Sequence, residues 1–297
     1  MSRPPFLTLP GCAHAYRLAT ARGEFAVHDA RPEGRPRGTV LLVPGFTGSK
    51  EDFIALLEPL ARAGVRAVAV DGRGQYESPG PDDEHAYALD ELARDVHAQA
   101  AALGDGPVHL LGHSFGGLVA RAAVLADARP FRSLTLMSSG PAGVSAEQRD
   151  RTRLLIHALT ELKLDMESVW REKVRLDGPG AAHDEFHHRR WTGTSPAQLA
   201  GAGRQLIETP DRTAELARTA LPKHVLSGEE DFAWPVPAMD AMAAALGARR
   251  TVIAGAGHSP AAERPGPTAD ALLAFWETLR ETTDEADPVS PAGPTSR

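Results

Sequence analysis

A serine between two glycines is the first feature of this sequence that could carry out chemistry. The run Leu110–Gly117 reads LLGHSFGG, and Ser114 has a glycine two residues away on each side. A strand is predicted to end at Leu111 and a helix to begin near Phe115. Such a sharp turn needs small neighbours, because the serine backbone is strained and adjacent elements approach closely. The pattern therefore predicts a nucleophilic hydroxyl that stands clear of a sheet.

Two later loops could supply what a serine nucleophile needs. A serine hydroxyl is a weak nucleophile near pH 7 and requires a general base. The base in turn needs an acceptor on its other ring nitrogen. The run GAGHSPAAERP, from Gly255, and the run LSGEED, from Leu226, resemble loops of the alpha/beta-hydrolase superfamily, in its branch with a helical cap. The resemblance covers about residues 20–280.

The resemblance implies that His258 is the general base and that Asp231 is the acid that orients it. Glu229 and Glu230 stand beside Asp231 and are the alternatives. Some relatives carry the acid after the sixth strand instead. Here that loop, Ser138–Pro141, contains no acid, which favours Asp231.

Two backbone N–H groups are candidates for an oxyanion hole, which must meet the negative charge that acyl transfer builds on the carbonyl oxygen. One belongs to Phe115, the residue after the nucleophile. The other belongs to Phe46, in the run PGFTGS that resembles the family's His-Gly-X loop. Pro44 stands where histidine is usual. This departure leaves the predicted donor intact and affects only how the loop is braced.

Several aromatic side chains are candidates for the wall of an acyl pocket. The run Asp71–Ser78 resembles the family's D-x-R-G-x-G-x-S loop, but Tyr76 replaces a glycine and could reach the pocket entrance. Trp170, Trp191 and Trp234 are predicted either to pack in the core or to line that pocket.

A histidine-rich run could suggest a metal site, but its details argue against one. His183 and His187 would share a helix face, as metal ligands do. However, Asp184 occupies the place that glutamate has in an H-E-x-x-H motif, and Arg189 and Arg190 would repel a cation. We predict no metal here and interpret the run as a solvated part of the cap.

The elements that must position these residues follow from hydrophobic patterns. Apolar runs predict strands at Glu24–His28, Val40–Val43, Val65–Val70, Val108–Leu111, Leu134–Met137, His224–Leu226 and Thr251–Ile253. Helical patterns lie between them, at 51–62, 89–103, 115–125, 238–246 and 269–279. This alternation predicts a parallel sheet with helices on both faces. The resemblance implies an α/β protein with the alpha/beta-hydrolase fold, a mostly parallel central sheet flanked by helices.

The alternation stops between residues 141 and 221, where only helical patterns occur. A helical segment inserted between two strands predicts a cap, or lid, over the strand ends. Residues 1–140 and 222–280 then form the core. Residues 281–297 have almost nothing to bury and are predicted to be a disordered tail.

Composition argues against several other classes of protein. The 297 residues include one cysteine, Cys12, which rules out an internal disulfide framework and a cysteine-based metal finger. The net charge of −7 argues against nucleic acid as the main partner. No apolar run approaches the roughly 18 residues of a membrane span. We expect a cytoplasmic protein, and its oligomeric state is left open.

Together these features predict a serine esterase, a carboxylic ester hydrolase that cleaves a small-molecule ester, thioester or lactone through an acyl-enzyme, without a cofactor. The alternatives on the same fold are an aminopeptidase and a carbon–carbon bond hydrolase. An aminopeptidase would need cap acids to hold an ammonium group, and the candidates are Glu161, Asp165, Glu167, Asp184 and Glu185. A non-catalytic ligand-binding member that kept the triad is the alternative from another class.

Overall fold

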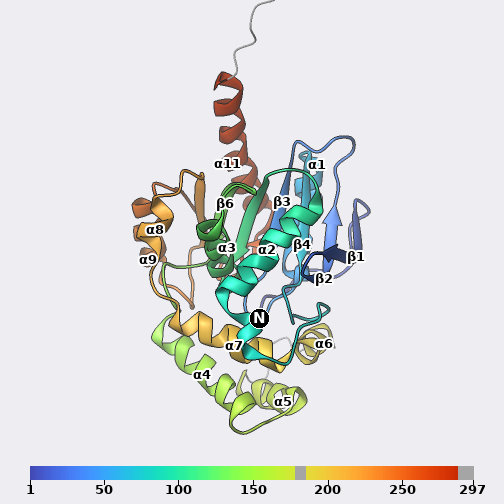
Figure 1. Ribbon diagram of the computed structural model, residues 1–297, viewed down its shortest axis with the longest axis vertical. Helices are drawn as coiled ribbons and strands as arrows, with labels where there is room; N and C mark the ends of the chain where they lie inside the picture. The colour runs from blue at the N-terminus through green and yellow to red at the C-terminus, as the bar shows by residue number, and fades with distance from the viewer. Residues whose placement is uncertain (178–184, 287–297) are drawn as a thin grey trace, which may run out of the picture.

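One sheet of eight strands organises the part of the chain that the computed structural model describes, residues 1–177 and 185–286 (Figure 1). In chain order the strands are β1 (Ala13–Thr20), β2 (Gly23–Ala30), β3 (Gly38–Val43), β4 (Val65–Val70), β5 (Val108–His113), β6 (Phe131–Met137), β7 (Lys223–Gly228) and β8 (Arg249–Ile253). Their order across the sheet is β1-β2-β4-β3-β5-β6-β7-β8. β2 pairs antiparallel with β1 and β4, whereas all pairs from β4 to β8 are parallel. This mostly parallel sheet confirms the predicted fold class.

The first strand, β1, is the one that the sequence does not predict. Its run AHAYRLAT has four consecutive exposed residues and lies at the edge of the sheet. It pairs with β2 along its whole length, from Ala13 opposite Ala30 to Thr20 opposite Gly23. Because most of β1 is exposed to solvent, its sequence lacks the apolar run from which the central strands are predicted.

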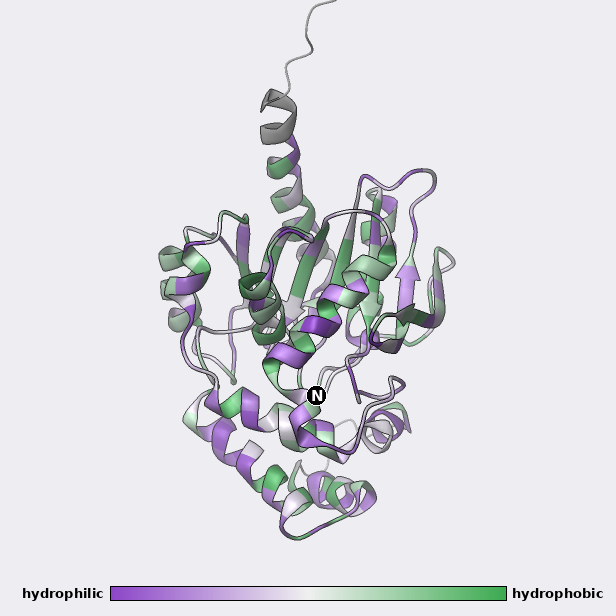
Figure 2. Ribbon diagram, in the orientation of Figure 1, coloured by the Kyte–Doolittle hydropathy of each residue, from purple (hydrophilic) through white to green (hydrophobic). Residues whose placement is uncertain are grey.

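Helices cover both faces of the sheet. The helices around the sheet are α1 (Ile54–Arg62), α2 (Leu89–Leu103), α3 (Phe115–Ala126), α8 (Thr213–Ala217), α9 (Val236–Leu246), α10 (Pro260–Glu263) and α11 (Pro265–Ala286), with 3-10 turns η1 (Lys50–Phe53) and η2 (Glu84–Tyr87). In β3, Leu41 and Val43 belong to the cluster that includes α2, α3 and α9, whereas Val40 and Leu42 belong to the cluster that includes α1 and α11. Burial on both faces explains why the central strands are rich in apolar residues (Figure 2).

Four further helices gather at one end of the sheet, opposite the end from which α11 projects (Figure 1). They are α4 (Ala146–Thr160), α5 (Met166–Asp177), α6 (Glu185–Gly193) and α7 (Pro196–Glu208). α7 begins as the sequence predicts, because Ser195 is the N-cap and Pro196 is the first helical residue. These four helices enclose a hydrophobic cluster of their own, made of Leu159, Met166, Val169, Trp170, Trp191 and Leu199.

Two boundaries differ from the predicted ones. α8 lies inside the predicted cap range of 141–221, but it packs on α3 and α9 beside the sheet. α11 continues to Ala286, past the predicted end of the core at residue 280. The remainder of the predicted tail, residues 287–297, lies outside the described residues. Within the described ranges, no helix combines the length and the apolar character that a membrane crossing requires.

Candidate active site

Ser114 lies at the turn between β5 and α3, where its backbone has a φ of 55° and a ψ of −122°. A non-glycine residue at positive φ is strained. Two glycines allow the turn. A Cβ added at Gly112 would lie 2.2 Å from the Gly116 carbonyl oxygen, and one added at Gly116 would lie 2.4 Å from two carbonyl oxygens at the end of β3. The turn leaves the serine side chain at the carboxyl end of the sheet.

Three side chains from separate loops lie in a hydrogen-bonded row. His258 Nε2 is 3.0 Å from Ser114 Oγ, and His258 Nδ1 is 2.8 Å from Asp231 Oδ2. The Asp231 side chain is fully buried, and its other oxygen accepts hydrogen bonds from the N–H groups of Ala233 (2.8 Å) and Trp234 (3.0 Å). A carboxylate can only accept, so Nδ1 carries the ring proton and Nε2 can accept the serine proton. The structure thus brings together the three predicted residues.

The two neighbouring acids are directed elsewhere. Glu229 accepts a hydrogen bond from the Gly255 N–H at 2.8 Å, and Glu230 is exposed. In the described part of the chain, His258 forms its carboxylate contact with Asp231 and with neither glutamate. The geometry therefore favours Asp231 over both alternatives.

The backbone around His258 is held by two residues that the sequence does not single out for this purpose. The Glu263 carboxylate accepts hydrogen bonds from the N–H groups of Ser259 (3.0 Å) and Gly257, on either side of the histidine. His113 Nε2 donates to the His258 carbonyl oxygen at 2.8 Å. Burial and the nearby His258 lower the pKa of His113 to about 4, so its ring is neutral near pH 7.

The N–H groups of Phe46 and Phe115 are available to a ligand. Neither group donates a hydrogen bond within the described ranges. The chain at Gly45 lies against the nucleophile, because a Cβ added there would be 3.1 Å from Ser114 Cβ. The two phenylalanine rings pack edge to face with centroids 6.3 Å apart. Two unpartnered donors near a serine side chain can stabilise a negatively charged oxygen.

The three predicted pocket tryptophans occupy two different places. Trp234 is buried, its Nε1 donates to the Ala142 carbonyl oxygen at 2.9 Å, and its ring lies 6.3 Å from the His258 ring. Trp170 and Trp191 pack 6.2 Å apart within the cluster of helices α4–α7. Whether these rings touch a substrate stays a prediction. Another ring near the site is Phe232, which is 63% exposed and 4.6 Å from the His258 ring.

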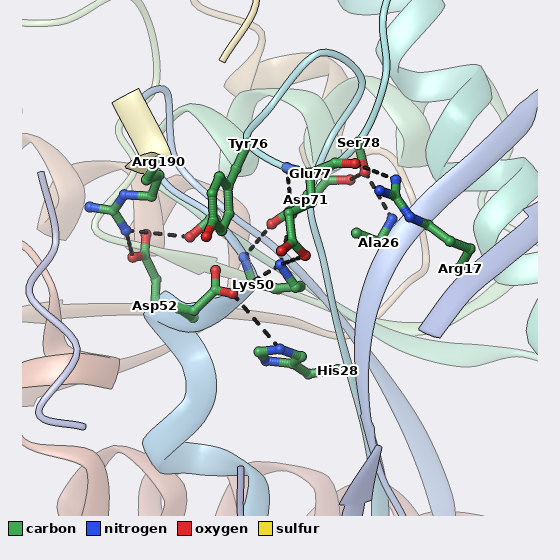
Figure 3. A network of polar contacts seen from close by, with 12 residues as sticks. Arg17, Ala26, His28, Lys50, Asp52, Asp71, Tyr76, Glu77, Ser78 and Arg190 are labelled. Atoms are coloured by element: carbon green, nitrogen blue, oxygen red, sulfur yellow. Dashed lines mark hydrogen bonds and ion pairs between the residues drawn. The ribbon is translucent and has the colours of Figure 1, made fainter. Parts of the chain in front are cut away.

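A buried cluster of charges lies where the chain leaves β3 and β4 (Figure 3). Lys50 Nζ forms ion pairs with Glu51 (2.9 Å), Asp71 (3.0 Å) and Glu77 (2.7 Å). Burial disfavours its charged form, but the carboxylates outweigh burial and raise the pKa of Lys50 above its usual range. The ammonium group also lies 4.8 Å from the centre of the Tyr76 ring. Tyr76 itself has a φ of 41°, in the region that favours glycine, although it stands where the family's loop has a glycine. Whether its ring reaches the pocket entrance stays a prediction.

Arg190 of α6 reaches into the same region from the helical segment (Figure 3). Its Nη1 lies 2.6 Å from Asp52 Oδ1, and both side chains are at most 3% exposed. The expectation that the run 183–188 and its arginines are solvated is therefore wrong for His187 and Arg190, which are buried. A carboxylate distant in sequence neutralises the arginine, so its charge can be buried. His183 and Asp184 lie outside the described residues.

Comparison with known proteins supplies the family. The model of the alpha/beta hydrolase family matches residues 40–271. The chain belongs to the alpha/beta hydrolase family. A hydrolase of known structure from Pseudomonas aeruginosa has a TM-score of 0.72 to this alpha/beta hydrolase, at 25% identity. That similarity covers 89% of this chain and 98% of the other.

Curated relatives of this alpha/beta hydrolase carry out more than one chemistry. The pimeloyl-[acyl-carrier protein] methyl ester esterase of Edwardsiella ictaluri is 28% identical, over 82% of this chain and 94% of its own length. The dihydrolipoyllysine-residue acetyltransferase component of the acetoin cleaving system of Cupriavidus necator is 32% identical over 85% of this chain. The chain spans 66% of the length of that component and 45% of another curated relative. Family and relatives together support hydrolytic activity.

Proposed function

We propose that this alpha/beta hydrolase is a serine hydrolase that cleaves a carboxylic ester, thioester or lactone through an acyl-enzyme. Ser114 is the nucleophile, His258 is the general base and acid, and Asp231 orients the imidazole. The observation that carries the proposal is the pair of hydrogen bonds, 3.0 Å and 2.8 Å long, that joins these side chains in the order the chemistry needs.

The reaction follows from the donors and acceptors in that row. His258 Nε2 takes the proton of Ser114 Oγ as the oxygen attacks the acyl carbon. The Asp231 carboxylate stabilises the imidazolium that forms. The N–H groups of Phe46 and Phe115 hold the oxyanion, and the same imidazolium then protonates the leaving alcohol, or the thiol of a thioester. Water activated by His258 completes the cycle by releasing the acid.

In this proposal helices α4–α7 form the cap that covers the acyl group. Phe46 packs both against the core cluster of α2 and α3 and against the separate cluster of α4–α7. Its backbone N–H is a proposed oxyanion donor, so the cap cluster reaches the residue that meets the substrate carbonyl. A cover at this place would exclude water and shape the acyl pocket.

The contacts of three acids in the helical segment favour ester cleavage over an aminopeptidase reaction. Glu167 pairs with His188, Glu185 pairs with Arg189, and Asp165 accepts the Ser168 N–H at the start of α5. These three carboxylates already have partners on the surface of the helical segment, and for this reason we favour ester cleavage.

The test is turnover of p-nitrophenyl esters of increasing chain length by the wild type and by Ser114→Ala. We expect Ser114→Ala to lose at least about 10³-fold in kcat, because only binding and the oxyanion hole remain. A fluorophosphonate should label Ser114. Ser139→Ala is the matched control, since Ser139 is equally buried near the elbow and its hydroxyl has no partner within the described ranges. Labelling at another residue, or an active Ser114→Ala, would contradict the assignment. A folded wild type that neither turns over esters nor reacts would favour a non-catalytic binding role.

A further inference from the structure

Gln75, in the loop after β4, bridges two loops through a buried side chain. Its Nε2 donates to the Gly45 carbonyl oxygen at 2.7 Å and lies 3.3 Å from the Phe46 carbonyl oxygen. Its Oε1 accepts the Gly72 N–H at 2.9 Å. The side chain is 4% exposed. A buried amide whose donors both meet one loop holds the backbone of that loop in a defined orientation.

The orientation of the Gly45–Phe46 peptide decides where the Phe46 N–H points. In a trans peptide the carbonyl and the following N–H point in opposite directions. The Gly45 carbonyl oxygen is fixed by Gln75 and also accepts the Gly48 N–H at 3.1 Å. The Phe46 N–H must therefore point away from Gln75, and it is the group left without a partner in the described part of the chain.

Pro44 cannot hold the oxyanion loop through a hydrogen bond of its own. Pro44 has neither an N–H nor a polar side chain, so it has no donor with which to hold the loop. The bracing must come from another element, and the amide of Gln75 is the side-chain donor that reaches both the Gly45 and the Phe46 carbonyl oxygens.

The loop that carries Gln75 is itself held from the side of the helical segment. The Gly74 carbonyl oxygen accepts the Ser195 N–H at 2.8 Å, and the Tyr76 N–H donates to Thr194 Oγ1 at 3.2 Å. Both partners lie where α6 ends and α7 begins. The residues on either side of Gln75 are thus fixed to the segment that covers the site, and Gln75 connects this segment to the oxyanion loop.

We infer that Gln75 is a positioning residue for the oxyanion hole, which holds the Gly45–Phe46 peptide so that the Phe46 N–H meets the developing oxyanion. This role of Gln75 rests on the proposed function, and it adds a residue that acts on the reaction without touching the substrate. Loss of the Gln75 donor should weaken transition-state stabilisation more than ground-state binding, because the oxyanion contact strengthens only when the charge forms.

Two variants separate the donor from the rest of the side chain. Gln75→Glu keeps the size and can still accept the Gly72 N–H, but in its carboxylate form it loses the donor to Gly45 and Phe46. Gln75→Met is uncharged and loses both contacts, which guards against failure of the buried glutamate to fold. The matched control is Gln99→Met, because Gln99 is equally buried and makes no hydrogen bond to the oxyanion loop in the described contacts.

The readouts are kcat and KM for an ester and the second-order rate of fluorophosphonate labelling at Ser114, with folding checked by urea titration. Because removal of a whole oxyanion donor costs about 10²–10³ in kcat, we expect a misplaced donor to cost about 10- to 100-fold. KM should change less than about threefold, and labelling should slow in parallel with kcat. Gln99→Met should leave all three values near those of the wild type.

The outcomes distinguish this inference from the proposal beneath it. A folded Gln75→Met with wild-type kcat and labelling rate would overturn the role of Gln75 and leave the triad standing. A rise in KM alone, with kcat unchanged, would also overturn it. A wild type that is neither hydrolytic nor labelled at Ser114 would overturn the proposed function and this inference together.

Discussion

Asp231→Asn is the substitution whose effect the geometry of this site defines most sharply. In the wild type, Oδ1 accepts two backbone N–H groups, from Ala233 and Trp234, and Oδ2 faces His258 Nδ1 at 2.8 Å. An asparagine has one acceptor oxygen and one donor nitrogen. The two backbone donors will retain the oxygen, so the NH₂ group must face His258.

The consequence is the wrong tautomer of the imidazole. Facing a donor, His258 Nδ1 must accept, so the ring proton moves to Nε2, which is 3.0 Å from Ser114 Oγ. Nε2 can then no longer take the serine proton. The substitution also removes the charge that stabilises the imidazolium. In Ser-His-Asp enzymes such a change lowers kcat about 10⁴-fold, or about 5.4 kcal/mol at 1.36 kcal/mol per factor of ten.

The assay is kcat for an ester at pH 7, measured for Asp231→Asn beside Glu230→Gln and Glu229→Gln. The glutamine variants are matched controls, because each exchanges one carboxylate for an amide in the same loop. The amide oxygen introduced by Glu229→Gln can still accept the Gly255 N–H that Glu229 accepts at 2.8 Å. We expect both controls within about threefold of the wild type, since neither acid contacts His258. A severe Glu230→Gln, or an Asp231→Asn variant with a tenth of wild-type activity, would refute the reasoning.

Two further predictions concern stability. Arg190→Met and Asp52→Asn should each lower the free energy of unfolding by about 3–5 kcal/mol in urea titrations, because each leaves a buried charge unpaired. The double variant should lose less than the sum of the two single losses. Additive losses, or single losses below about 1 kcal/mol, would show that the two side chains are not coupled. Burial lowers the pKa of four histidines well below 6.5, so below that pH the unfolded state binds more protons than the folded state. The free energy of unfolding should therefore fall from pH 6.5 toward pH 4, by up to about 1.4 kcal/mol per pH unit for each ring. Equal urea midpoints at pH 7 and pH 5 would contradict this. These histidines are His28 and His113, with a pKa of about 4, and His109 and His224, with a pKa of about 3.

The parts of the fold that the sequence predicts are those governed by local rules. The central strands contain short apolar runs because helices cover both of their faces, and the start of α7 follows from Ser195 and Pro196. The edge strand β1 escapes prediction because four residues in a row are exposed, and only its pairing with β2 makes it a strand.

The three proposed catalytic residues are predictable on two grounds. Ser114 directly follows β5 in a glycine-lined turn that limits what the backbone can do, whereas His258 and Asp231 are predicted because their loops resemble those of the family. The residues that hold the site are not predictable in this way. Glu263 clamps the backbone on both sides of His258, Gln75 fixes the Gly45 carbonyl, and neither contact has a sequence signature.

Local sequence is enough to predict the strands β2–β8 and the turn at Ser114, because these depend on hydrophobic periodicity and on glycines within a few residues, and its motifs are enough to show the resemblance to the family. The burial of Arg190, and the choice of Asp231 over its neighbours as the partner of His258, depend instead on the folded chain. Arg190 and Asp52 are 138 residues apart, and Asp231 and His258 are 27 apart. A charge is buried or exposed according to the partner that folding brings to it, and no local pattern contains that partner.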